Sequence, residues 1–135
     1  MIITSKNTQE IDGLNLHDLW LDEMSYNHVQ NRLTLLLTDE EKHCSRPLVA
    51  NEVAFFHVNA LQPWGRGHYV FDIEQVEEKT RLQMIQAAEA YRNLDQTPVT
   101  DPAIGFIITM NSGDTITVFC RSMEYDHSYG KTQEA

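Results

Sequence analysis

The sequence lacks most of the features that assign a small protein to a functional class. Cysteine is scarce: Cys44 and Cys120 lie far apart and without CxxC spacing. The chain has no apolar, cleavable N-terminus and no apolar run long enough to span a bilayer. We therefore expect a cytoplasmic protein with two reduced thiols, Cys120 buried in a strand and Cys44 in a polar loop. The spacing alone leaves a disulfide between them open.

Positive charge is also scarce. Ten basic residues against twenty acidic ones give a formal net charge of -10. A surface of this sign repels the phosphates of nucleic acids and anionic lipid headgroups, so we expect neither nucleic acid nor a membrane as partner. Charge favours a protein partner with a basic face, although acidity can also serve only to keep a small protein soluble.

Signatures of catalysis and metal binding are missing as well. The stretch NLHDLWLDE, residues 15–23, places His17 beside Asp18, as some metal-dependent phosphohydrolases do. Its pattern favours a strand, in which neighbouring side chains point to opposite faces and would not share one metal. No HxxxH, HExxH or CxxC partner is present. We predict no catalytic residue, no metal and no cofactor, and we expect His17 and Asp18 to begin a strand.

Strand patterns dominate what is present. A polar N-terminal segment, loose or a short edge strand, precedes the β-rich runs, and a polar tail from Asp126 follows them. The predicted elements are a hairpin over residues 14–37 with its turn at 28–31, a charged loop at 38–47, an interior strand within 51–61 that buries His57, a short strand at 68–71, and a hairpin over 103–125 with its turn at 111–114.

One helix is predicted between these strands. Apolar and small residues recur at intervals of three or four from Ile73 to Leu94, which places them on one helical face. Asp72 and Gln75 have the spacing of a capping box. The sequence therefore predicts a single α+β domain over residues 1–135. We expect a mainly antiparallel sheet of five or six strands, with one amphipathic helix at about residues 74–93.

A binding surface is predicted in the turn LQPWGRGHY. Trp64, Arg66 and Tyr69 are of types enriched at binding hot spots. The alternative is that the aromatic side chains seal an end of the sheet. The acidic loop contributes Asp39, Glu40 and Glu41 to the same predicted partner-binding set.

The order of several stretches resembles small bacterial immunity proteins of the polymorphic-toxin type. The matching stretches are residues 16–21, 32–37, 53–58, 70–73 and 116–125, about half the chain. The long helix after Ile73 departs from that pattern. The resemblance implies a cytoplasmic, non-enzymatic protein that neutralises a cognate toxin by binding it, and an acidic surface suits a basic toxin domain.

Two other classes of function stay open. One is an enzyme or small-ligand binder whose pocket lies between sheet and helix and uses His57, Tyr69, Arg121 or Glu124. The other is a self-assembling module, a homodimer in which an exposed strand such as the one ending at Tyr125 pairs across a two-fold axis.

Overall fold

The described part of the chain folds as one bent antiparallel sheet. The structure, a computed structural model, describes residues 1–39, 41, 43–59, 69–77, 79–80, 83 and 104–126. Its elements are β1 (Ile2–Ile3), the 3-10 helix η1 (Thr8–Ile11), β2 (Trp20–Asn27), β3 (Arg32–Asp39), β4 (Cys44–Asn59), β5 (Val70–Gln75), β6 (Ile104–Met110) and β7 (Thr115–Tyr125). The strand order is β2-β3-β4-β7-β6-β5, and β1 pairs with β7.

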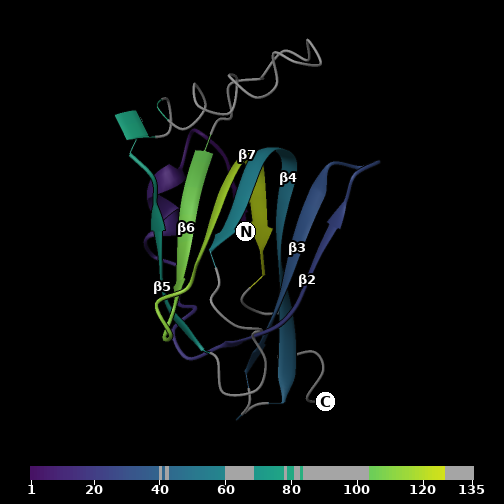
Figure 1. Ribbon diagram of the computed structural model, residues 1–135, viewed down its shortest axis with the longest axis vertical. Helices are drawn as coiled ribbons and strands as arrows, with labels where there is room; N and C mark the ends of the chain where they lie inside the picture. Colours follow the sequence, from purple (N-terminus) through teal and green to yellow (C-terminus); the bar gives the residue numbers. More distant parts are fainter. Residues whose placement is uncertain are drawn as a thin grey trace.

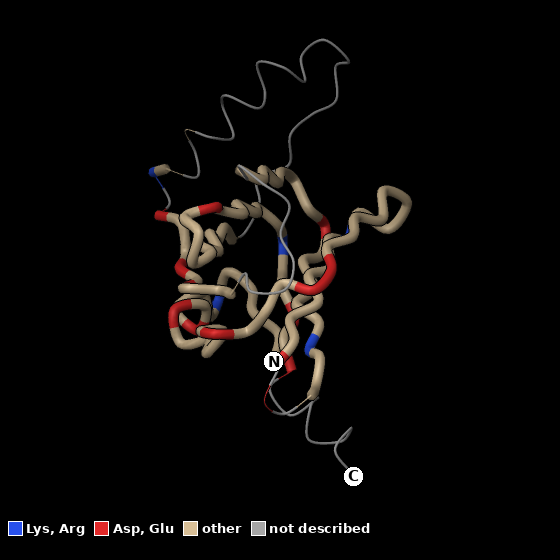
Figure 2. The backbone as a smooth tube through the Cα atoms, turned by 60° about the horizontal axis from the view of Figure 1, so that its bottom comes forward, with Lys and Arg blue, Asp and Glu red and all other residues tan. Residues whose placement is uncertain are grey.

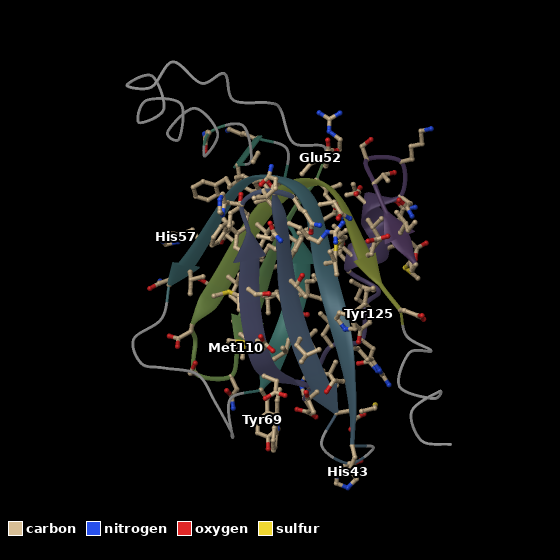
Figure 3. The ribbon with its side chains drawn as sticks, turned by 90° about the vertical axis from the view of Figure 1, so that its right-hand side faces the viewer. His43, Glu52, His57, Tyr69, Met110 and Tyr125 are labelled. Carbon is tan, nitrogen blue, oxygen red and sulfur yellow. The ribbon has the colours of Figure 1, made fainter. Side chains whose placement is uncertain are left out.

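Strand β4 connects the two halves of the sheet. Its first part pairs with β3, and its register against β7 shifts between Val53 and Phe55. Glu52, just before this shift, has a positive φ of 50°. A bulge of this kind bends a strand and increases its twist. Figures 1 and 3 show the consequence: β4 curves over at one end, with β2 and β3 on one side of the molecule and β5, β6 and β7 on the other.

The two edge strands meet where they begin. Trp20 and Tyr69 form an antiparallel bridge. On one side of this bridge, the Val70 amide donates to the Leu19 carbonyl at 2.8 Å, and the Asp18 amide donates to the Val70 carbonyl at 2.9 Å. The sheet is therefore tied together at this end, which we call the closed end.

Alternating side chains fill the space between the two halves. Leu33, Leu35 and Leu37 of β3 are almost fully buried, and so are Ile104, Phe106 and Ile108 of β6. A side chain on every second residue faces the same side of a strand, so these residues share one core. The core cluster also includes Ile3, Ile11, Leu48, Val118 and Tyr125.

A smaller apolar cluster lies on the other face of the sheet. Phe119 and Val76 are buried there, with Phe55 and Ile107 packed against them. Gly105 makes this possible, because a Cβ at that position would lie 2.6 Å from a ring carbon of Phe119.

The α+β prediction is wrong. Seven strands form the described part of the chain, and its only helix of defined bounds is the four-residue η1. The predicted helix at 74–93 does not begin where expected, because Glu74 and Gln75 belong to β5 and pair with β6; most of its remaining residues lie outside the described ones. No described helix is long and apolar enough to cross a membrane.

The first interval of the predicted helical spacing has another physical explanation. Ile73 and Val76 are three residues apart, yet Ile73 belongs to the main core and Val76 to the cluster with Phe119. Extended chain covered on both sides can thus produce an apolar spacing of three. The supposed capping residue Gln75 instead donates its backbone and side-chain N–H groups to the Asp12 carboxylate, at 3.1 and 2.9 Å.

The predictions for the hairpins were better than those for the charged loop. The β2–β3 turn at 28–31 and the β6–β7 turn at 111–114 are confirmed, the latter with Gly113 at φ 92°. The segment 38–47 is mostly strand, because β3 ends at Asp39 and β4 begins at Cys44. Cys44 is consequently buried rather than in a polar loop, and both cysteines are free.

Candidate functional site

A polar pocket of about 440 Å³ lies where the edge strands meet. The described residues that line it are His17, Asp18, Leu19, Asp39, Glu41 and Tyr69. They come from three parts of the chain: the turn before β2, the end of β3 with the loop that follows it, and the residue before β5. We call this the closed-end pocket.

The His-Asp step forms a turn instead of the predicted strand. Asp18 has a positive φ of 69°, a conformation that Asp tolerates better than most residues. The His17 Nδ1 lies 3.0 Å from the Asp18 Oδ1, and both side chains are more than half exposed. The turn therefore presents an imidazole and a carboxylate next to each other at the pocket.

Tyr69 also lines the pocket and is held by two neighbouring parts of the chain. Its ring packs edge-on against Trp20, with centroids 5.6 Å apart. Its backbone is also held in place. The Tyr69 amide donates to the Asn111 Oδ1 at 3.3 Å, and the Tyr69 carbonyl accepts from the Asn111 amide at 2.9 Å. Figure 3 shows Tyr69 and His43 at the same end of the molecule, with Glu52 and His57 toward the other end.

Asp39 and Glu41 supply the acidic side of the pocket. The Glu41 amide donates to the Asp39 Oδ1 at 3.1 Å, which fixes the chain as it leaves β3. Asp39 is half-buried and Glu41 is exposed. With Asp18, the pocket thus has three carboxylates, one imidazole and one phenol. Carboxylates attract a cation, and an aromatic ring face can add a cation–π contact.

Three of the six predicted partner-binding residues line this one pocket: Tyr69, Asp39 and Glu41. Trp64, Arg66 and Glu40 lie outside the described residues. His17 and Asp18 were not predicted to belong to this set, because a strand was expected at these residues. One local signal for a turn was present: Asp18, a residue type that tolerates a positive φ, stands just before the strand pattern of β2.

The residues predicted for an enzyme pocket do not come together among the described residues. Tyr69 lines the closed-end pocket, whereas Glu124 lines a second pocket beside Ile2 and Pro47. Arg121 faces Glu52, with Nε and Oε2 3.4 Å apart. His57 is exposed and stacks on Phe55, contrary to the prediction of a core histidine.

Both cysteines are buried, and Cys120 in particular is poorly suited to nucleophilic chemistry. Burial raises the pKa of the Cys120 thiol to about 12, and a thiol held protonated is a poor nucleophile.

Within the described ranges, no group of three or more His, Cys, Asp or Glu side chains is positioned to hold a metal ion.

Acidic positions are distributed over much of the described chain. Figure 2 shows them on both halves of the sheet and in the connecting loops, with few basic positions between them. The closed-end pocket is therefore a concave site in a chain with a formal net charge of -10. The chain matches no protein-family model and no curated protein, so the geometry of this pocket is the basis for inferring function.

Proposed function

We propose that this protein is a cytoplasmic, non-enzymatic binding protein that receives a basic side chain of a protein partner in the closed-end pocket. The observation that carries the proposal is the convergence of Asp18, Asp39, Glu41 and Tyr69 on one concavity. An inhibitor of the immunity type, which neutralises a basic toxin by contact, is the kind of protein that such a pocket suits.

The chemistry of the pocket favours an arginine or lysine as the group received. An arginine forms paired hydrogen bonds with carboxylates, and its planar group stacks on aromatic rings. The net charge of -10 adds long-range attraction for a basic partner and raises the rate of encounter. Binding of this type weakens as salt screens the charges.

A small cationic ligand is the second candidate, because the pocket volume lies within the range of ligand sites, about 300–1,000 Å³. The same carboxylates would hold such a ligand. Capture from a lysate separates the two candidates, because a protein partner is retained with the tagged protein and identified as a protein, whereas a small ligand is not.

The test is capture from a lysate of the native cell with the tagged protein, at low and at high salt. A pocket variant, Asp39→Asn with Glu41→Gln, is compared with a control variant, Asp72→Asn with Glu74→Gln on β5. Both variants remove two carboxylates from exposed or half-buried positions, so they change the net charge equally. Any retained protein is then titrated directly against all three forms.

We expect one basic protein that is retained at low salt and lost at high salt. Its affinity should fall at least tenfold in the pocket variant and little in the control, because only the first removes groups that face the bound side chain. Equal loss in the two variants would show that overall charge, and not the pocket, is responsible. Retention of no basic protein by any form would refute the proposal.

A further inference from the structure

Among the described strands, none pairs with the outer edge of β2 beyond its contact with β5. β2 ends the strand order of the described sheet, and its bridge to the β5 side is at Trp20. Every residue from Asp22 to Asn27 is exposed. Figure 1 shows the β2–β3 hairpin extending away from the rest of the sheet in this region. An edge strand of this kind presents unpaired backbone groups to a further strand.

Apolar side chains accompany this open edge. Met24 and Tyr26 pair across the sheet with the buried Leu35 and Leu33, so they face the core side. They nevertheless remain 37% and 41% exposed. Phe56 of β4, 37% exposed, packs against the Tyr26 ring with centroids 5.2 Å apart. The core layer thus continues into an uncovered apolar strip of three residues, the β2 strip.

We infer that the occupant of this edge is the β2 strand of a second copy of the chain, paired antiparallel about a two-fold axis. A two-fold axis normal to the sheet keeps each side chain on its own face, so Met24 can lie opposite Tyr26 of the second copy, and Ser25 opposite Ser25. This register joins the two β2 strips. It also places Glu23 opposite Asn27, which avoids facing like charges.

The inferred pairing differs from the self-assembly suggested by the sequence. The strand that ends at Tyr125 is β7, which lies between β4 and β6 and pairs with β1 near its end. β4, β6 and β1 thus occupy most of its two edges. The strand to which the pairing is assigned is β2, whose register shift between Leu21 and Glu23 separates the closed end from residues 23–27, where the pairing is placed.

Salt should strengthen this dimer, whereas it should weaken the binding of a basic partner. Two copies of an acidic chain repel each other, and salt screens that repulsion. A pairing of one short strand also buries less than the standard interface of about 1,600 Å². We therefore expect a reversible dimer that is weak at low salt and strengthened by salt.

The experiment is sedimentation of the full chain at concentrations up to about 1 mM, at low and moderate salt. Met24→Lys places a charge within the β2 strip and should weaken the dimer at least tenfold. Met24 is partly exposed, so this variant should fold, and circular dichroism verifies that it does. The control is Glu74→Lys on β5, which also adds a lysine but leaves β2 unchanged, and should dimerise at least as well as the wild type.

Cysteine cross-linking tests the register independently. Ser25→Cys should form a disulfide-linked dimer rapidly on mild oxidation, since residue 25 meets its own copy, whereas Glu74→Cys on the other edge should not. Both native cysteines are buried and do not compete. A chain that stays monomeric at every concentration and salt, a dimer unaffected by Met24→Lys, or equal cross-linking of the two cysteine variants would overturn the inference.

Discussion

Cys120 and Tyr125 make the stability of this fold sensitive to alkaline pH. Burial raises the pKa of the Cys120 thiol from 9.0 to about 12 and also raises the pKa of the Tyr125 hydroxyl. Above pH 9 the unfolded chain releases the thiol proton while the folded chain keeps it. The free energy of unfolding should therefore fall as pH rises from 9 toward 12, by at most about 1.4 kcal/mol per pH unit for each group.

Urea denaturation at pH 8, 9, 10 and 11 measures this dependence. Cys120→Val keeps an apolar side chain of similar size in the core and removes one titrating group, so its slope should be smaller than that of the wild type. Identical slopes in the two proteins would mean that Cys120 does not contribute. At pH 8 the native protein should react slowly with a thiol reagent and the unfolded protein rapidly, because both cysteines are buried.

Gly105 is required for close packing and not for backbone conformation. A Cβ there would meet two ring carbons of Phe119 at 2.6 and 2.7 Å, and Phe119 is fully buried. Gly105→Ala should destabilise the protein by about 1–3 kcal/mol through overpacking. The matched control is Gly13→Ala, whose Cβ would lie 3.6 Å from the Glu10 carbonyl oxygen, an ordinary contact.

The denaturation midpoints of the two alanine variants measure whether the close contact with Phe119 determines stability. The control should remain within about 1 kcal/mol of the wild type, because replacing glycine at an unstrained position chiefly restricts the unfolded chain. Equal stability of both variants would show that Phe119 moves aside at little cost, and that the tight contact does not determine stability.

At the scale of elements, the bend of β4 depends on the positive φ of Glu52. A β-branched residue is strained in this conformation, whereas asparagine tolerates it. Glu52→Val should therefore be about 1–2 kcal/mol less stable than Glu52→Asn. Both variants remove the exposed contact with Arg121, so their difference isolates the backbone effect.

Arg121→Gln measures the contact with Glu52 separately, by the same denaturation experiment. The two side chains are more than half exposed, and exposed ion pairs contribute less than about 1 kcal/mol. If valine were tolerated as well as asparagine at position 52, the bend would have another origin, such as the packing of Phe55 against Phe119.

The elements that could be predicted from the sequence are those whose signals are local. Gly113 identifies the turn between β6 and β7 because a positive φ is needed there, and uninterrupted aliphatic residues identify β3. The first part of β4 could not be found in this way. Arg46 and Pro47 suggest a loop, yet both belong to β4, which pairs with β3 along this stretch and, from Leu48 on, with β7, a strand distant in sequence.

The pocket was predictable only in part for the same reason. Asp39, Glu41 and Tyr69 were identified by residue type, but nothing local indicates that β2 and β5 begin side by side. That arrangement follows from the bend of β4 and the strand order. His17 and Asp18 were misplaced because a strand pattern extends back from Trp20, whereas the backbone turns at Asp18 to bond with Val70.

At the scale of the whole molecule, the net charge of -10 should make stability rise with salt. Like charges brought together by folding repel one another, and the unfolded chain holds them farther apart. Raising the ionic strength from about 10 mM to about 150 mM shortens the screening length from about 30 Å to about 8 Å. Relief of about 1 kcal/mol would raise the melting temperature by roughly 3–4 °C in a domain of this size.

Two charge variants at exposed positions test whether repulsion is the cause. Glu74→Lys makes the chain less acidic and should flatten the rise in melting temperature with salt; Lys6→Gln makes it more acidic and should steepen it. Both side chains are exposed, so packing should change little. Thermal denaturation followed by circular dichroism at the two salt concentrations provides the measurement. A melting temperature that rises equally in all three proteins would point to a specific ion site or a general salt effect, because neither depends on the net charge that the variants alter.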